Sequence, residues 1–373
     1  MLYATHARIH LGNIRDNLRA IRGAVGPDRK ILIAVKANAY GHGAVEVSRM
    51  AEATGSADAL GVATVPEGLE LRQAGITLPI LKLGPTFPWE MEAAVAAGLT
   101  LAVCSPAEAE ALAQAAAAAG KTAKAHLKVD TGMGRVGVTP EGAPDLAARL
   151  AALPGVELEG VFTHLPVSDE ADPAYTRAQI DRFRATAGAA QAAAGRPLTV
   201  HCANSGAVLG HACGWMDLVR PGIMIYGFYP DAGTPRSVPL KPGMSVLTRI
   251  SFVKRVAAGT RIGYGGTWTA PQDTWIGTLP AGYADGFNRL FSNRGRVLID
   301  GRSYPVVGRV CMDQSMVDLG PETPVKVGDE VVLMGRSGGE AITADEWAEK
   351  LGTITYEVTC QINGRVARVH EGF

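Results

Sequence analysis

The sequence shows no excess of charge of either sign and few cysteines. Its 373 residues include 36 lysines and arginines and 36 aspartates and glutamates. We therefore expect neither a basic surface that binds nucleic acid nor a charged tail. The cysteines are Cys104, Cys202, Cys213, Cys311 and Cys360. Their odd number, wide spacing and lack of a CxxC pair argue against a disulfide framework and against a metal site such as zinc, and indicate a reducing compartment.

The sequence also offers no segment typical of secretion or of membrane insertion. The first residues, MLYATHARIHLGN, do not contain the apolar stretch of a signal peptide. The most apolar long segment, AEALAQAAAAAGKTAK, is short and flanked by charges, which is typical of a soluble helix. We expect a cytoplasmic protein that does not bind membranes.

Short apolar runs alternate with longer, alanine-rich segments of helical period between residues 31 and 227. The apolar runs predict strands at 31–35, 59–64, 79–84, 99–104, 123–129, 158–163, 198–202 and 218–227. The segments between them predict helices at 44–53, 66–74, 88–97, 106–119, 140–152, 173–194 and 204–210. This alternation is typical of a parallel α/β sheet. Eight strands favour a closed (β/α)₈ TIM-type barrel over the alternative, an open doubly wound sheet.

The pattern changes after residue 233, where PDAGTPRSVPLKPG has the composition of a linker. The following runs are of β type, with an Asp-Gly hairpin signal in VLIDGRSYPVV and one capped helix in TADEWAEKLG. We therefore expect a barrel domain at 1–233 and a mainly-β domain at 234–373. The opening segment ATHARIHL predicts a strand that could belong to either domain.

Ionisable or hydrogen-bonding residues follow several of the predicted strands. They are Lys36 and Tyr40 after the first strand, Lys128, Asp130 and Arg135 at the fifth, His164 after the sixth, Asn204 and Ser205 after the seventh, and Arg220, Gly222 and Ile223 in the eighth. Active sites of such barrels lie at the carboxyl ends of the strands. We expect these residues to gather at one rim.

Two features of this rim predict its chemistry. The segments NSGA and RPGI offer a hydroxyl and exposed backbone N–H groups, which can bind an anion such as a phosphate. Lys36 ends an apolar strand, and desolvation there would lower its pKa and favour Schiff-base formation. Pyridoxal 5′-phosphate (PLP) has both an aldehyde and a phosphate, so it matches both features.

The chain resembles the alanine racemase family of barrel-fold PLP enzymes. The resemblance covers nearly the whole sequence through AVKANAYGHG, LKVDTGMGRVG, THL, ANSGA, VRPGIMIYG, IGYGGTW, AGYADGFNR, GRVCMDQSMVD and YEVTC. It implies interconversion of L-alanine and D-alanine, which supplies D-alanine for peptidoglycan. Alternatives on this architecture are a broader racemase acting on serine or lysine, and a PLP decarboxylase. A PLP-carrier protein is a third alternative, although such proteins resemble the first half alone.

The resemblance also implies roles for individual residues. Lys36 would carry PLP and act as one acid–base, while Tyr264 in GYGG would act on the opposite face. Racemisation moves a proton between two faces, so two flanking groups make chemical sense. Arg220 would face the pyridine nitrogen and, with His164, form a relay behind Tyr264. The other residues expected around the cofactor are Tyr40, Asn204, Ser205, Gly222, Ile223 and Tyr356.

Further residues are implied at the substrate. Arg135 would contact the cofactor's phenolic oxygen and the substrate carboxylate, and Lys128 would be carbamylated by CO₂ and orient this arginine. Met312 would present its backbone N–H to the carboxylate, and Tyr283 would narrow the entrance. In the family, residues matching Tyr264, Tyr283, Cys311, Met312 and Asp313 come from the second subunit. The resemblance therefore implies a homodimer with shared active sites.

Two positions depart from the family pattern. His10 stands in ARIHL, where the family usually has aspartate or asparagine, and Pro166 follows THL, where a small residue is more common. Neither change removes a catalytic group, but Pro166 could reshape the rim near His164.

Overall fold

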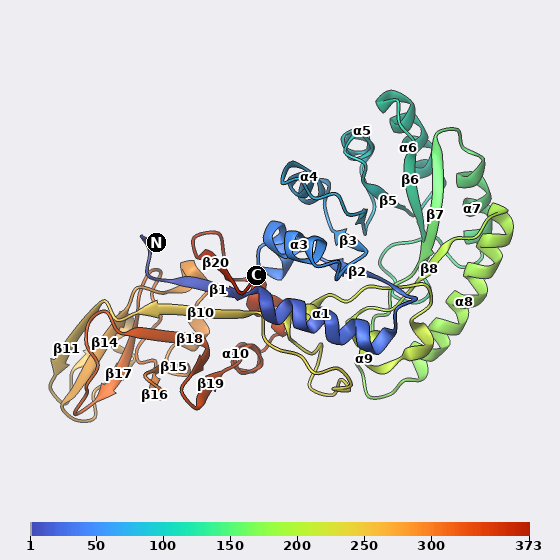
Figure 1. The fold of residues 1–373 in the computed structure, drawn as a ribbon. Helices are drawn as coiled ribbons and strands as arrows, with labels where there is room; N and C mark the ends of the chain where they lie inside the picture. The colour runs from blue at the N-terminus through green and yellow to red at the C-terminus, as the bar shows by residue number, and fades with distance from the viewer. Residues whose placement is uncertain (1) are drawn as a thin grey trace. The chain divides into compact units, whose positions relative to one another are not determined.

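The computed structural model describes residues 2–373, which fall into two compact units. One unit is Asn13–Lys241, and the other combines the N-terminal residues up to Gly12 with Pro242–Phe373 (Figure 1). Within residues 2–373, no helix is both long enough and apolar enough to cross a bilayer.

The unit Asn13–Lys241 is built around a closed parallel sheet. Its strands are β2 (Lys30–Ala34), β3 (Ala59–Val62), β4 (Ile80–Lys82), β5 (Thr100–Val103), β6 (Ala123–Lys128), β7 (Val156–Phe162), β8 (Thr199–His201) and β9 (Leu218–Val219). Each of β2 to β7 pairs in parallel with the next strand, and β9 pairs in parallel with β2. Backbone N–H groups of Asp217 and Arg220 donate to the carbonyls of Val200 and Ala203 (3.1 and 2.8 Å). These bonds join the last two strands, so the predicted (β/α)₈ barrel is confirmed.

Helices lie along the outside of these strands (Figure 1). They are α3 (Ala44–Ala53), α4 (Val65–Gln73), α5 (Pro88–Ala96), α6 (Pro106–Ala119), α7 (Ala143–Ala152), α8 (Ala174–Ala194) and α9 (Ser205–Gly210). All correspond to predicted helices. At the start of α6 the Ser105 hydroxyl accepts from the Glu108 N–H (3.3 Å), as expected of an N-cap. The Glu108 carboxylate, however, accepts from the N–H of Cys104 at 2.6 Å, one residue earlier than a capping box requires.

Two segments of the barrel unit differ from the prediction. Helix α1 (Leu11–Val25) is absent from the predicted helices. The strand predicted at 218–227 was wrong beyond Val219, because Pro221 has no N–H to donate to a strand ladder. After it, Ile223–Tyr226 form a 3₁₀ helix, η2.

The second unit is mainly β. Its largest sheet has the order β16 (Arg302–Pro305), β15 (Arg296–Ile299), β18 (Glu330–Ser337), β10 (Met244–Arg249), β1 (His6–His10) and β20 (Ala367–Glu371), with β19 (Glu340–Ile342) paired to β18. A second sheet contains β11 (Phe252–Val256), β14 (Thr274–Leu279) and β17 (Ser315–Gly320), and β12 (Arg261–Ile262) pairs with β13 (Trp268–Thr269). Two helices, α10 (Ala344–Leu351) and α11 (Thr355–Cys360), complete it.

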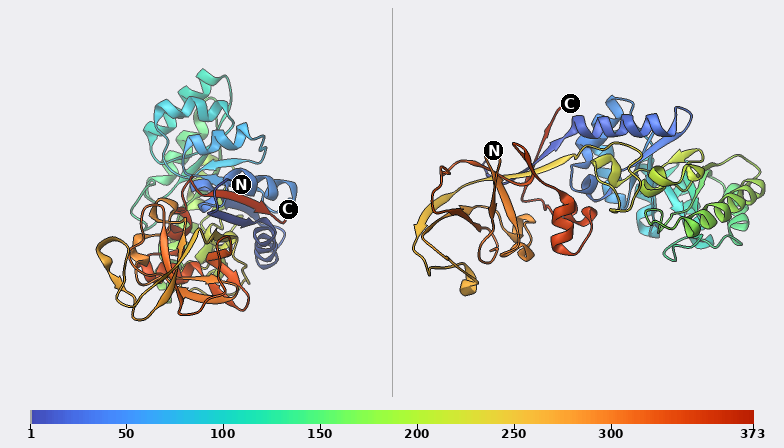
Figure 2. Two further views of the ribbon diagram at one scale, coloured as in Figure 1. Left: turned by 90° about the vertical axis from the view of Figure 1, so that its left-hand side faces the viewer. Right: turned by 90° about the horizontal axis from the view of Figure 1, so that it is seen from below.

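The first and last strands of the chain, β1 and β20, lie side by side in parallel (Figure 2). The strand predicted in ATHARIHL thus belongs to the β unit, whose C-terminal part begins at Pro242. His10, one of the two departures from the family pattern, contacts Glu371 (2.8 Å) and Ser245 (3.0 Å) in this sheet. The predicted hairpin is also present, since Asp300 and Gly301 have φ of 47° and 72° between β15 and β16.

Candidate active site

Lys36 stands at the end of β2, directly after the buried Val35. The four residues that follow it form a left-handed turn, with φ of 51°, 52°, 54° and 53° at Ala37, Asn38, Ala39 and Tyr40. Left-handed backbone costs about 1–2 kcal/mol per residue that is not glycine. Strain of this kind persists only where the surroundings impose it, and it is common at functional sites.

Contacts from neighbouring segments impose the left-handed turn. The Glu67 carboxylate accepts from the Ala37 N–H (2.7 Å), and the Asn38 side-chain oxygen accepts from the Ala44 N–H (2.8 Å). The ring of Tyr40 is buried at 5.1 Å from the ring of Tyr226, between centroids.

The turn fixes Tyr40 relative to Lys36. The Lys36 Nζ atom lies 5.9 Å from the centre of the Tyr40 ring. The turn thus places an amine and a phenol next to each other at one strand end.

Four residues predicted around the cofactor lie together and form a cradle, namely Tyr40, Ser205, Gly222 and Ile223. The Ser205 hydroxyl accepts from the N–H groups of Gly222 (2.9 Å) and Met224 (3.5 Å). A methyl group at Gly222 would lie 2.8 Å from the Tyr40 hydroxyl, so a larger residue there would displace this hydroxyl. Ile223 follows as the first residue of η2. Hydroxyls and backbone N–H groups gathered in this way suit a phosphate.

Asn204 holds Ser205 of this cradle in place through hydrogen bonds at the start of α9. Its side-chain oxygen accepts from the Ala207 N–H (3.1 Å) and from the Ser168 hydroxyl (2.7 Å), and its amide donates to the Leu165 carbonyl (2.8 Å). These bonds cap α9 and place Ser205 at the start of the helix. A direct contact of Asn204 with the cofactor stays a prediction.

The guanidinium of Arg220 is buried and held on several sides. Its Nη2 donates to the carbonyls of Thr163 (2.7 Å) and Cys202 (3.1 Å), and its Nη1 lies 2.9 Å from Nδ1 of His201. The His201 Nε2 atom in turn lies 2.8 Å from Nδ1 of His126. Burial lowers the pKa of Arg220 to about 10. The side chain therefore stays cationic at neutral pH.

The residues predicted from sequence omit His126 and His201. Both lie in strands, within the apolar runs AKAHLKV and LTVHC, and a histidine inside such a run is the signal that could have found them. Burial, followed by the charge of Arg220, lowers the pKa of His126 to about 3 and that of His201 well below its ordinary value. Both histidines are therefore neutral.

Lys128 is buried at the end of β6, with its Nζ 4.5 Å from the centre of the Phe162 ring. Burial and then the charge of Arg220 lower its pKa to about 7, and the charge of Arg135 contributes as well. Much of Lys128 is therefore a neutral amine at neutral pH, which is its nucleophilic form.

Arg135 lies in an exposed loop that Asp130 organises. The Asp130 carboxylate accepts from the N–H groups of Gly132, Met133 and Gly134 at 3.0, 2.9 and 3.1 Å. Burial alone would raise the pKa of Asp130, but these donors bring it below its ordinary value. The carboxylate thus stays ionised and holds the loop in shape.

His164 lies partly buried after β7, and charged side chains of the barrel affect its pKa. Burial lowers its pKa well below the ordinary value, and the charges of Arg220, Lys128, Arg135 and Lys36 lower it further. The His164 imidazole is therefore neutral at neutral pH.

The remaining predicted residues belong to the β unit. Tyr264, in the 3₁₀ turn η3 (Tyr264–Gly266), is 69% exposed, Tyr283 in η4 (Tyr283–Asp285) 42%, and Met312 53%. Tyr356 is partly buried in α11. Tyr264, Tyr283 and Met312 thus stand open to solvent in this single chain.

Family models match both parts of the chain. The model described as the alanine racemase N-terminal domain matches residues 9–230, and the C-terminal domain model matches residues 243–370. Over 369 residues the chain is 52% identical to an alanine racemase of Cutibacterium acnes, covering 99% of this chain and 98% of that protein.

Solved structures agree with these matches. An alanine racemase of Clostridium difficile is similar with a TM-score of 0.94 and 39% identity, covering 100% of this chain and 96% of that one. One from Bacillus anthracis, with bound L-Ala-P, is similar with a TM-score of 0.92 and 35% identity, covering 100% and 96%. The chain that places Lys36, Ser205 and Arg220 at one barrel rim belongs to the alanine racemase family.

Proposed function

We propose that this chain interconverts L-alanine and D-alanine with PLP as its cofactor. The observation that carries the proposal is the cradle of Ser205, Gly222 and Tyr40 beside Lys36, in a chain 52% identical to an alanine racemase. When bound, PLP supplies an aldehyde for a lysine and an electron sink that acidifies the Cα proton of an amino acid.

The residues of the barrel fit this cofactor. Lys36 would hold its aldehyde carbon, and the hydroxyls and N–H groups of the cradle would hold its phosphate. Arg220 would donate a hydrogen bond to its ring nitrogen. Because a guanidinium does not give up its proton at neutral pH, that nitrogen would stay uncharged.

Two residues would move the proton at Cα. Racemisation removes a proton from one face and returns one to the other. Lys36 would serve one face, and Tyr264 the other. A tyrosine, with an ordinary pKa of ~10, needs nearby positive charge to act as a base near neutral pH, which Arg220 would supply with His164 as the neutral partner between them.

The substrate carboxylate would be held by Arg135 and by the backbone N–H of Met312. We also propose that the neutral amine of Lys128 adds CO₂ and releases a proton, becoming a carbamate anion. The product carries a negative charge, which attracts the Arg135 guanidinium and can orient it.

We further propose a homodimer in which the barrel of one subunit and the β unit of the other form each site. The exposed Tyr264, Tyr283 and Met312 support this arrangement. Coexpression of Lys36→Ala chains with Tyr264→Phe chains tests it, because each mixed dimer then holds one intact site. We expect about a quarter of the wild-type activity to return. No return would mean that both residues come from the same chain.

A panel of amino acids tests the substrate. L-Alanine, L-serine, L-lysine and L-ornithine are incubated with the PLP-loaded protein, followed by chiral analysis and CO₂ detection. We expect inversion of alanine to be fastest, without CO₂ release. Faster inversion of serine or lysine would favour a broader racemase, and CO₂ release would favour a decarboxylase.

We also propose that the protein works in the cytoplasm and supplies D-alanine for peptidoglycan. A strain depleted of this protein should require added D-alanine for growth, and growth without it would contradict this role.

A further inference from the structure

Two loops of the β unit, 282–286 and 311–314, are joined by backbone hydrogen bonds. The N–H of Tyr283 donates to the Cys311 carbonyl (3.0 Å), and that of Ala284 to the Met312 carbonyl (2.9 Å). A methyl group at Gly282 would lie 2.3 Å from the Cys311 oxygen, so only glycine permits this approach. The backbones of Tyr283 and Met312 are therefore held together by one pair of loops.

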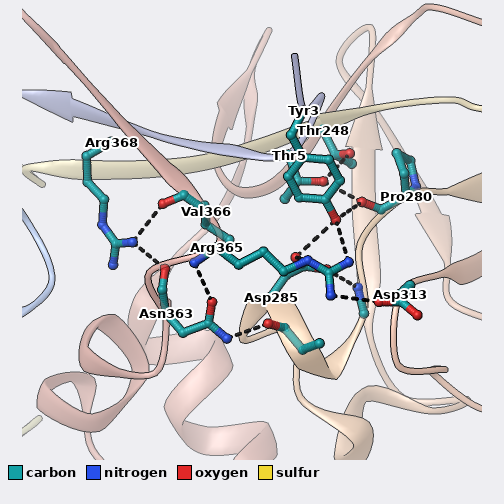
Figure 3. Close-up of polar contacts among 12 residues, drawn as sticks. Tyr3, Thr5, Thr248, Pro280, Asp285, Asp313, Asn363, Arg365, Val366 and Arg368 are labelled. Carbon is teal, nitrogen blue, oxygen red and sulfur yellow. Dashed lines mark hydrogen bonds and ion pairs between the residues drawn. The ribbon is translucent and has the colours of Figure 1, made fainter. Parts of the chain in front are cut away.

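Arg365, between α11 and β20, joins both loops through its side chain (Figure 3). Its Nε lies 3.2 Å from an oxygen of Asp285, and its Nη1 lies 2.7 Å from an oxygen of Asp313. Its Nη2 lies 3.4 Å from the Tyr3 hydroxyl, and its guanidinium lies 5.5 Å from the centre of the Tyr3 ring. A planar guanidinium can bridge two carboxylates, whereas a lysine ammonium is a single point charge.

The two carboxylates differ in their surroundings. The side chain of Asp285 is 1% exposed and that of Asp313 is 55% exposed. Asp285 also accepts from the Gly282 N–H (2.9 Å) and from the Tyr3 hydroxyl (3.0 Å). Arg365 thus ties an exposed loop to a carboxylate that is already fixed inside the unit.

The backbone around Arg365 is fastened to the same turn. The Asn363 side chain accepts from the Arg365 N–H at 2.9 Å and donates to the Ala284 carbonyl. Both the backbone and the side chain of Arg365 are therefore fixed relative to the Tyr283 turn (Figure 3). The loop that carries Met312 is held against this fixed frame through Asp313.

We propose that Arg365 is a positioning residue that holds the Met312 backbone N–H and the Tyr283 side chain in the places where alanine is bound. This inference rests on the proposed function, in which Met312 binds the substrate carboxylate and Tyr283 narrows the entrance. In this role Arg365 acts through Asp285 and Asp313 rather than by touching the substrate. Its loss should therefore weaken substrate binding and leave cofactor binding unchanged.

Kinetics of Arg365→Lys in the PLP-loaded full chain test the proposal. We expect KM for L-alanine to rise about tenfold, the size of effect that a lost hydrogen bond between charged groups gives. The dissociation constant of PLP should stay within about twofold. Arg296→Lys is the matched control, because Arg296 pairs with both oxygens of Glu346 (2.9 and 2.8 Å) in the same unit. Arg296→Lys should leave KM unchanged.

Amide hydrogen exchange at Tyr283 and Ala284 gives a second readout that does not depend on activity. We expect exchange at both amides to be faster by about tenfold in Arg365→Lys and unchanged in Arg296→Lys. Unchanged exchange, or faster exchange with an unchanged KM, would overturn the proposal. A wild-type protein that does not racemise alanine would overturn the proposed function and the role in substrate binding, while the exchange rates would still decide whether Arg365 holds the loops.

Discussion

The Nη1 atom of Arg220 lies 2.9 Å from Nδ1 of His201, and this contact fixes the proton positions of two histidines. A guanidinium only donates, so Nδ1 of His201 must accept and its proton must lie on Nε2. That proton then points to Nδ1 of His126, 2.8 Å away, which must also accept. A chain of neutral groups thus holds the cation that would face the cofactor nitrogen.

His201→Leu should impair both stability and catalysis. It leaves an N–H of Arg220 without its acceptor in a buried place, so the free energy of unfolding should fall by about 1–3 kcal/mol. The racemisation rate should fall as well, because Arg220 is no longer held. Urea unfolding and racemisation kinetics measure the two effects.

His126→Leu is the matched control for that variant. It removes the contact with His201 but leaves the contact between His201 and Arg220 in place. Its stability should fall while its racemisation rate stays near that of the wild type. Equal rate losses in the two variants would contradict the role given to His201.

The same histidines should make the protein less stable in acid. Burial first, and then Arg220, keeps the folded pKa values of His126 and His201 below the ordinary 6.5. Below pH 6.5 the unfolded chain therefore binds more protons than the folded one. The free energy of unfolding should fall by up to about 1.4 kcal/mol per pH unit for each histidine. Urea unfolding at descending pH measures how steeply the free energy of unfolding falls, and His126→Leu should make this fall less steep. An equally steep fall in His126→Leu would contradict a lowered pKa of His126 in the folded chain.

Lys128→Met should be more stable than the wild type in CO₂-free buffer at pH 7. The pKa of Lys128 falls from 10.5 to about 7, first through burial. Between these values the unfolded chain keeps a proton that the folded chain has lost, so the stability of the unmodified wild type rises with pH. The stability advantage of Lys128→Met over the wild type should therefore shrink towards pH 10. Thermal unfolding of both proteins across this pH range measures it.

Bicarbonate should reduce the difference in stability between Lys128→Met and the wild type at pH 7, because carbamylation would stabilise the folded wild type. Trapping of labelled CO₂ followed by mass spectrometry would locate the added group on Lys128. No effect of bicarbonate on the wild type would argue against the modification.

Gly222→Ala should weaken PLP binding by at least about tenfold, because its methyl group would lie 2.8 Å from the Tyr40 hydroxyl in the cradle. Gly210→Ala, at the end of α9, is the matched control, since its methyl group meets nothing nearer than 3.6 Å. PLP titration followed by absorbance compares them. Equal affinities would mean that the cradle does not bind the cofactor.

Much of the barrel could be predicted because its local signals agree with its fold. Helix α6, for example, begins after the capping Ser105 and ends at Gly120, which has the left-handed φ of 62°. The residues at strand ends also indicated the rim, because parallel strands place their carboxyl ends on one side.

Other features had no local signal. The left-handed turn Ala37–Tyr40 contains no glycine, and contacts from Glu67 and other distant residues impose it. The pairing of β1 with β10 and β20 joins segments at opposite ends of the chain. The role of Arg365 likewise had no sequence signal, because its partners Asp285 and Asp313 come close to it only in the folded chain.

We propose that Lys36 and Tyr264 exchange the Cα proton of alanine from two faces. Incubation of L-alanine and D-alanine separately in heavy water tests this mechanism. The wild type should invert both enantiomers and place deuterium at Cα, whereas Tyr264→Phe should exchange one enantiomer only, without inversion. Full racemisation by Tyr264→Phe, or a PLP-bound wild type that exchanges neither enantiomer, would contradict the claim.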